Sequence, residues 1–231
     1  MTVILFVAIA IFSSHVFADV VVFEKYKTTF TMDGDKLKVY KKLRLMNIGS
    51  NPIIPGEIHF KLSKQEGNEI IPVEISDLAI IDHYDREMTS NLNKGSKETD
   101  IIFTIWEPLL PKFFYDFTIT YKIDFEPKGL LFYEINIPEE KTTIKIKQKE
   151  TEFLLPKKFH VTYAPDATVD VKDKSRVIQW ATSSNQNFEY SLIPLPKIGV
   201  RMVNIFWILL ISICLLYLVT RFIKTRKSVD Y

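Results

Sequence analysis

Cysteine is nearly absent from this chain: its single cysteine, Cys214, lies inside a long apolar run near the C-terminus. The preceding region therefore has no disulfide framework, although export would permit one. No asparagine begins an Asn-x-Ser/Thr sequence, so N-glycosylation is not expected. Both absences favour a bacterial or archaeal surface over a eukaryotic one. At roughly 180 residues, the region before the apolar run buries enough surface to be stable without disulfides.

Glycine and clustered positive charge are also scarce. With only seven glycines, the chain has no Gly-rich phosphate loop, and it contains no nucleophile elbow. The net charge is +2, and the last eleven residues carry four basic side chains and one acidic one, which leaves −1 for the rest. A near-neutral region lacks the positive field that binding to phosphate backbones demands. A nucleic-acid partner is therefore excluded.

The most distinctive feature that is present is the uncharged run Val203–Thr220. As an α-helix it is long enough to cross a hydrocarbon core of ~30 Å. Trp207 and Tyr217 lie near its two ends, where aromatic side chains gather at membrane interfaces. The run predicts a transmembrane anchor from Val203 to Thr220, with the lipid bilayer as a partner.

The charges that flank this run predict its orientation. The tail, residues 221–231, contains a basic flank, while Lys197 and Arg201 are the only charges shortly before the span. An excess of Lys and Arg marks the cytoplasmic side, so the N-terminal region is expected outside, at the cell surface or in the lumen of the endoplasmic reticulum of a eukaryote. The residues of the predicted cytoplasmic flank are Arg221, Lys224, Arg226 and Lys227.

The N-terminus supplies the export signal that this orientation requires. Val3–Phe12 is an apolar run, and Val16-Phe17-Ala18 is an acceptable cleavage site, so residues 1–18 are predicted to be a cleaved signal peptide. The missing Lys or Arg before the run leaves an uncleaved anchor, and hence a two-span protein, as the alternative.

From Val20 to the apolar run, the hydrophobic period is two, which is typical of strands. Asp33-Gly34 predicts a tight hairpin, because this dipeptide tolerates positive φ. The return strand places Leu37, Val39, Leu43 and Leu45 on one face and basic residues on the other; Lys41 interrupts the apolar face and Tyr40 the basic one.

Later segments differ in how clearly they alternate. Phe113–Phe125 is the strongest strand pattern, and its length of roughly 43 Å predicts a bulge or bend within it. Ile70–Ile81 is a less regular strand, and 82–97 is expected to be a polar loop. Two further strands are expected around 58–62 and 101–105. The last expected strands are 131–137, 142–149, 158–163, 168–171, 177–181 and 188–192.

Pro127-Lys128-Gly129 is the best candidate for a domain boundary. The sequence thus predicts an all-β fold of two tandem, Ig-like β-sandwich modules, at residues 19–127 and 128–197, followed by the C-terminal transmembrane helix. The second module is small and is expected to pack against the first. Pro194 and Pro196 make the connector to the span short and stiff, which favours an ectodomain close to the membrane.

One loop gathers several ionisable groups. Asp82, His83 and Asp85 lie in it, and carboxylates with an imidazole are potential ligands for a divalent cation. Their spacing matches no Ca²⁺ loop, so a solvated polar loop is the simpler interpretation. His59 and His160 alternate with apolar residues and are expected to face solvent. We therefore predict no catalytic site, no cofactor and no metal, with this loop as the weak candidate.

Aromatic residues offer possible binding positions. Tyr40 and Phe114 are expected to be exposed and are possible contacts with a partner protein or a glycan. Trp106 and Trp180 lie at strand ends and are expected to be buried.

Together these features favour a non-enzymatic, single-pass type I membrane protein that binds other membrane or surface proteins, as an accessory or structural subunit of a membrane complex. The alternative is a surface receptor for glycans or a small ligand, and the third hypothesis is a membrane-tethered hydrolase.

Overall fold

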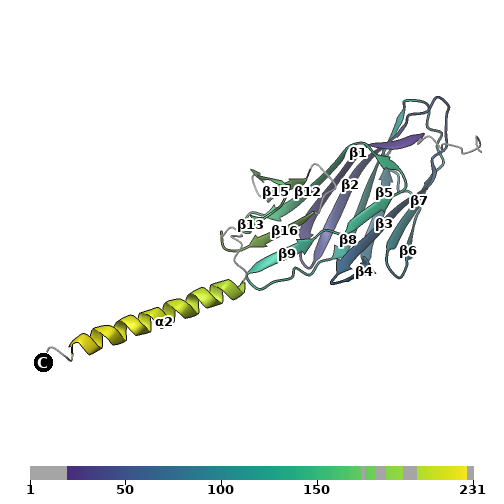
Figure 1. Cartoon of the computed structure of the whole chain (residues 1–231). Helices are drawn as coiled ribbons and strands as arrows, with labels where there is room; N and C mark the ends of the chain where they lie inside the picture. The colour runs from purple at the N-terminus through teal and green to yellow at the C-terminus, as the bar shows by residue number, and fades with distance from the viewer. Residues whose placement is uncertain (1–19, 173–174, 181–185, 195–201, 228–231) are drawn as a thin grey trace, which may run out of the picture. The chain divides into compact units, whose positions relative to one another are not determined.

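The structure is a computed structural model that describes residues 20–172, 175–180, 186–194 and 202–227. It is mostly β, with several sheets and one apolar helix at the C-terminal end (Figure 1). The helix is α2 (Met202–Lys227). The strands are β1 (Val21–Asp33), β2 (Lys36–Asn47), β3 (Gly56–Glu66), β4 (Glu69–Pro72), β5 (Ile75–Asp82), β6 (Ser90–Lys94), β7 (Thr99–Ile105), β8 (Phe114–Asp124), β9 (Phe132–Asn136), β10 (Glu139–Thr142), β11 (Lys145–Ile146), β12 (Lys149–Pro156), β13 (His160–Tyr163), β14 (Thr168–Lys172), β15 (Ser175–Trp180) and β16 (Asn187–Ser191).

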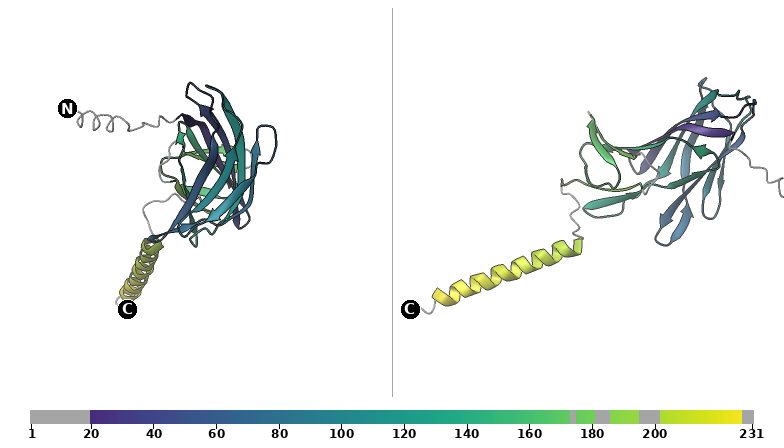
Figure 2. Two further views of the ribbon diagram at one scale, coloured as in Figure 1. Left: turned by 90° about the vertical axis from the view of Figure 1, so that its right-hand side faces the viewer. Right: turned by 45° about the horizontal axis from the view of Figure 1, so that its top comes forward.

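The strands form one large sheet and two small ones. The large sheet has the order β14-β15-β12-β1-β2-β8-β5, with β11 beside β1. A five-stranded sheet has the order β10-β3-β7-β6, with β4 beside β3, and a three-stranded sheet has the order β13-β16-β9. Figure 1 shows the two small sheets towards opposite ends of the large one, and Figure 2 shows the same layers from two further sides.

Aromatic contacts join both small sheets to one face of the large sheet. On the five-stranded side, the ring of Phe60 lies 5.7 Å from that of Phe23 in the large sheet. On the three-stranded side, Phe188 lies 4.6 Å from Phe153, which also belongs to the large sheet. Phe30 stacks on Phe153 at 6.3 Å, so the two halves share one continuous hydrophobic core.

The two tandem modules are not confirmed, because strands from both sides of the expected boundary share the large sheet. β12 follows the boundary in sequence, yet it pairs in parallel with β1, the first strand of the chain. The described residues from Val20 to Pro194 belong to one compact unit. A parallel pair needs a long crossover connection, and here all the strands from β2 to β11 lie in that connection.

The most regular predictions are confirmed. β1 and β2 form the expected hairpin, with Gly34 at φ 67° in its turn. β8 is one continuous strand and pairs with eleven residues of β2 without a register shift, so the bulge expected within it is wrong. In this sheet, register shifts occur between Phe23 and Lys25 of β1, in its pairing with β2, and between Ser76 and Ala79 of β5, in its pairing with β8.

Three segments differ from the sequence analysis. Ile70–Ile81 divides into β4 and β5, which belong to different sheets. The expected 82–97 loop contains β6, a polar edge strand whose side chains do not alternate in hydrophobicity. The sequence analysis did not predict β12, which lies between β1 and β15 in the large sheet. Its first four residues, Lys-Glu-Thr-Glu, are polar, so the alternation of buried and less buried positions along the strand is not visible as alternating hydrophobicity.

The helix α2 belongs to a second unit of the chain. Its window Ile205–Phe222 has a mean hydropathy of 2.3 and none of it is buried, which fits a single membrane span. The hydroxyl of Ser212 donates to the carbonyl of Ile208 at 2.8 Å, so this polar group is satisfied within the helix. Trp207 and Tyr217 are exposed along it. The predicted signal at 1–18 and the side chains of Val203, Lys224, Arg226 and Lys227 lie outside the described part of the chain.

Candidate functional site

Two loops of the sandwich are tied together where β2 ends. Asn47, the last residue of β2, is fully buried, and its amide donates to the carbonyls of Asn51 and Leu109, each at 2.8 Å. The carbonyl of Asn47 accepts the N–H of Lys112 at 2.9 Å. Together, the two hydrogen bonds of the buried amide and the one to the backbone carbonyl fix loops 48–54 and 106–113 against each other. We call this region, together with loop 82–87, the loop end.

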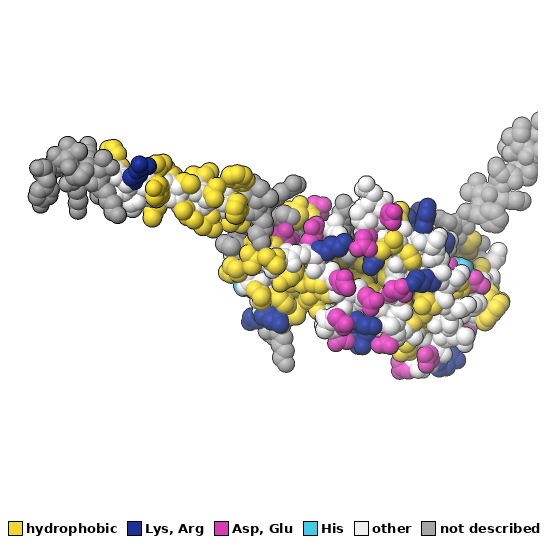
Figure 3. Space-filling model, turned by 90° about the horizontal axis from the view of Figure 1, so that it is seen from below, with side chains coloured by type: hydrophobic (Ala, Val, Ile, Leu, Met, Phe, Trp, Pro, Cys, Tyr) yellow, Lys and Arg dark blue, Asp and Glu magenta, His cyan; other side chains and the backbone are white. Residues whose placement is uncertain are grey.

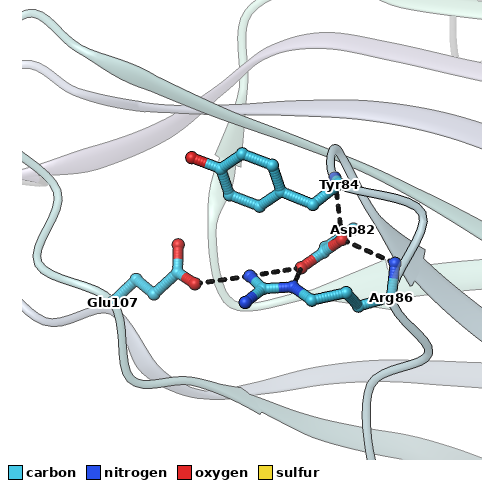
Figure 4. A network of polar contacts seen from close by, with 4 residues as sticks. All are labelled: Asp82, Tyr84, Arg86 and Glu107. Carbon is cyan, nitrogen blue, oxygen red and sulfur yellow. Dashed lines mark hydrogen bonds and ion pairs between the residues drawn. The ribbon is translucent and has the colours of Figure 1, made fainter.

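Loop 82–87 joins the loop end through an ionic network (Figure 4). The side chain of Asp82 is only 3% exposed, and its Oδ1 accepts the backbone N–H groups of Tyr84 and Arg86 at 2.8 and 2.9 Å. The Arg86 guanidinium donates to Asp82 Oδ2 at 2.8 Å and to Glu107 at 2.7 Å. Burial alone raises the pKa of Asp82, but the hydrogen bonds from Arg86 and Tyr84 outweigh it and hold this pKa below its usual value.

This network accounts for the residues predicted as weak metal ligands. Both oxygens of Asp82 already accept hydrogen bonds within the loop. The His83 ring lies edge-on to Tyr115, with centroids 4.9 Å apart, and Asp85 stands at φ 60° in the turn. In the part of the chain that the structure describes, no group of three His, Cys, Asp or Glu residues lies close enough to hold a metal ion.

Large apolar side chains project from the loop end. Trp106 is 75% exposed, and Phe113 is 61% exposed. The prediction that Trp106 is buried is wrong: Ile105 fills the last inward position of β7, and the next residue lies beyond the strand. Trp180 is buried as expected, and its indole N–H donates to the carbonyl of Pro165 at 3.2 Å. Further exposed residues of this end with large apolar side chains are Ile48, Ile54, Tyr84, Leu110 and Phe114.

The two aromatic residues predicted as partner contacts lie on the same outer sheet face but not together. Phe114 packs under the Arg44 guanidinium, 4.1 Å from its ring centroid, and Arg44 also binds Asp116 through two hydrogen bonds. Tyr40 pairs with Thr120, six residues along β8 from Phe114, which is a separation of about 20 Å. Phe114 therefore belongs to the loop end, whereas Tyr40 stands apart from it.

A buried ion pair lies elsewhere, between β2 of the large sheet and β10 of the five-stranded sheet, and the sequence analysis did not find it. Lys41 points from β2 into the core with 1% of its side chain exposed, and its ammonium group meets the carboxylate of Glu140 on β10. The rings of Phe60 and Tyr121 each have their centroid 5.4 Å from the ammonium nitrogen. Burial lowers the pKa of Lys41 although Glu140 opposes the shift, and burial raises the pKa of Tyr121 well above its usual value. We call this region the seam.

A polar cleft opens at the seam. Its volume is ≈ 680 Å³, and Glu140 and Lys149 line it. Gln186 also lines it, and its amide donates to the hydroxyl of Thr151 at 2.8 Å. Asn136 and Asn187 add further amides. Such a cleft offers hydrogen-bond donors and acceptors to a small polar ligand.

The two histidines expected to face solvent both have partners. His59, on the outer face of β3, has Nδ1 2.8 Å from Asp100 and Nε2 2.8 Å from Glu57. The hydrogen bond with Asp100 is the main reason that the pKa of His59 is raised. His160 lies 3.2 Å from the guanidinium of Arg176.

No family model matches the chain. It is similar to an uncharacterized protein of Methanocaldococcus jannaschii, with 27% identity over 141 residues that make up 59% of this chain and 99% of the relative. Among solved structures it resembles an M1 zinc metallopeptidase from Deinococcus radiodurans, with a TM-score of 0.46, 9% identity and coverage of 74% of this chain. The chain spans about two fifths of that enzyme's length, 42%. Neither likeness assigns the chain to a family.

Proposed function

We propose that this chain is a non-enzymatic, single-pass type I membrane protein whose β-sandwich lies outside the cytoplasm and binds another protein through its loop end. In this role it serves as an accessory subunit of a membrane complex. The orientation is supported by the basic residues at 221–227 and by the apolar N-terminal run, which resembles a signal peptide.

The exposed aromatic side chains of the loop end carry this proposal. Trp106 and Phe113 are each more than half exposed, and they project from loops that Asn47 and the Asp82 network hold in place. Rigid loops that display large aromatic groups are typical of protein-binding surfaces, because such side chains bury much area and lose little conformational freedom. Apolar side chains gathered on a soluble domain otherwise favour aggregation.

The position of the loop end in the sandwich also supports an accessible partner site. β2 ends and β8 begins at the loop end, so this is one extremity of the large sheet. The chain leaves the sandwich at Pro194, after β16, which pairs with β9 in the three-stranded sheet towards the other extremity (Figure 1). The loop end and the last described residue of the sandwich, Pro194, therefore lie towards opposite extremities of the sandwich.

Site-specific photocrosslinking in intact membranes tests the proposal. A benzophenone side chain at position 106 or 113 is expected to give one adduct of defined mass, identified by mass spectrometry. Ile70 is the matched control, because it is 53% exposed but lies on β4, at the far end of β3 from the loop end. The proposal fails if neither loop position gives an adduct, or if Ile70 gives the same adducts.

The cleft at the seam favours the second hypothesis, a receptor for a small polar ligand or a glycan. Its amide and charged side chains support hydrogen bonding to such a ligand. Tyr40, the other predicted glycan contact, lies on the outer face of the large sheet, about 20 Å from Phe114. Glycan-array binding by the purified protein, repeated with Asn187→Ala and Tyr40→Ala, separates the two surfaces. Loss of binding with Asn187→Ala alone supports the cleft, loss with Tyr40→Ala alone supports the sheet face, and no binding by the wild type argues against this receptor role for glycans.

A further inference from the structure

The end of the three-stranded sheet displays a second group of apolar side chains. Leu130 is 79% exposed and Leu131 46% exposed, just before β9; Leu192 is 58% exposed and Ile193 43% exposed, just after β16. The loop end and the seam contain none of these four residues. Figure 3 shows hydrophobic side chains gathered where the sandwich ends with these strands.

The register of the strands makes these four residues neighbours. β9 and β16 are antiparallel, with Phe132 opposite Ser191, so the residues immediately beyond this pair lie side by side. Gly129 lets the chain before the two leucines pass close to the backbone of Phe132. Its φ is 142°, and a Cβ atom there would lie 1.8 Å from the carbonyl oxygen of Phe132. Backbone hydrogen bonds between Lys128 and Glu134 close the loop that carries the two leucines.

A basic turn lies on the same edge. β13 is the third strand of this sheet, and its His160 is opposite Ser191, so the preceding residues extend in the same direction as Leu192 and Ile193. Phe159 is partly buried, and Lys157 and Lys158 before it are exposed. The edge thus combines two lysines with four aliphatic side chains, and we call it the foot.

The length of the following chain limits where the foot can lie. Eight residues, 194–201, separate Ile193 from the first residue of α2, Met202. Even fully extended, this connector reaches no more than about 30 Å. The described part of the sandwich ends at the foot, at Pro194. The loop end lies at the start of β8, whose eleven residues span about 37 Å.

We propose that the foot is a membrane contact, in which the four aliphatic side chains enter the interfacial layer of the bilayer and Lys157 and Lys158 bind anionic phospholipid headgroups. Aliphatic groups flanked by lysines are the composition that binds such an interface. This inference rests on the proposed function, because it requires α2 to span the bilayer. The contact would hold the sandwich in one orientation, with the loop end directed away from the lipid.

Fluorescence quenching with the full chain in anionic vesicles tests this contact. Cys214 is replaced by serine, and one cysteine at position 131 or 192 carries an environment-sensitive fluorophore. Labels at these positions are expected to be quenched by brominated lipid and protected from iodide, whereas a label at Ile70, 53% exposed on β4, behaves in the opposite way. Replacing Lys157 and Lys158 with glutamate is expected to remove most of the lipid quenching in anionic vesicles.

A label at Leu210, within α2, separates failure of the contact from failure of the anchor. If lipid quenches position 210 but iodide quenches positions 131 and 192, the foot proposal is overturned and the anchor stands. If lipid does not quench position 210, the membrane span itself is wrong, and the foot proposal falls with it. Protection of 131 and 192 from both quenchers would assign the foot to a protein interface instead and would also overturn the proposal.

Discussion

Glu140 at the seam and Asp82 at the loop end are both largely buried carboxylates that meet a basic side chain, but their partners differ in exposure. Lys41, the partner of Glu140, is 1% exposed, whereas Arg86, the partner of Asp82, is 58% exposed and also reaches Glu107. A buried cation has lost its hydration and depends on its one counter-ion, while an exposed cation remains hydrated. The seam pair is therefore mutually dependent, whereas Asp82 is held mainly by hydrogen bonds within its own loop.

Breaking the seam pair is expected to have the largest effect. Glu140→Gln leaves the Lys41 ammonium group in the core without a counter-ion, and losing one partner of a buried pair costs about 3–5 kcal/mol of unfolding free energy. The measurement is urea unfolding of the full chain, followed by the fluorescence of the buried Trp180 after Trp106 and Trp207 are replaced by phenylalanine.

The double variant Lys41→Met with Glu140→Leu is the control for this effect. Because it removes both charges and fills the same space with apolar groups, its unfolding free energy is expected to equal or exceed that of the wild type. If the double variant is as unstable as Glu140→Gln, packing at the seam matters more than charge, and the mutual dependence of the pair is refuted.

Asp82→Asn is expected to have a smaller effect, about 1–2 kcal/mol, because the asparagine keeps one acceptor oxygen but loses the charge that binds Arg86. The pKa of Asp82 is lowered in the folded protein, so its stabilisation is present above the ordinary aspartate pKa of about 3.9 and is lost as the pH falls through the lowered value. Urea unfolding at a series of pH values should therefore show wild type and variant converging in acid. A difference that is constant at all pH values would contradict this.

The contrast between the two pairs also shows what the sequence could predict. Alternating hydrophobicity correctly predicted β2 and β8, because each buries one face along its whole length. The same pattern also showed that Lys41 interrupts the apolar face of β2. Its partner could not be inferred, since Glu140 lies 99 residues away in the sequence and reaches Lys41 only through the pairing of β10 with β3.

Long-range pairing explains the remaining differences from the sequence analysis. β12 pairs in parallel with β1, and no local pattern specifies a partner more than a hundred residues away. A turn signal such as Pro127-Lys128-Gly129 indicates a break in the chain's direction and does not show whether the next strands join the same sheet. Trp106 was wrongly predicted to be buried, because it follows the last residue of β7, and beyond the end of a strand the alternation no longer indicates which side chains are buried.

His59 provides a pH dependence of opposite sign. Its pKa is raised, chiefly by the hydrogen bond with Asp100, so its stabilisation is present below the ordinary histidine pKa of about 6.5 and is lost as the pH rises through the raised value. His59→Gln should therefore flatten the fall in stability near neutral pH and leave unchanged the loss of stability in acid, to which Asp82 contributes. The check is the same unfolding series; a variant that changes only the acid limb would contradict this assignment.

Glu107→Gln is expected to have the smallest effect of the four, although it removes one of the two carboxylates that bind Arg86. The guanidinium is exposed and keeps Asp82 as a partner, and the two backbone N–H groups that bind Asp82 do not depend on Glu107. Unfolding free energy should therefore stay within experimental error of the wild type, in low and in high salt. If Glu107→Gln instead destabilises the protein as much as Asp82→Asn, then the loop end depends on the whole ionic network, and its proposed difference from the seam is lost.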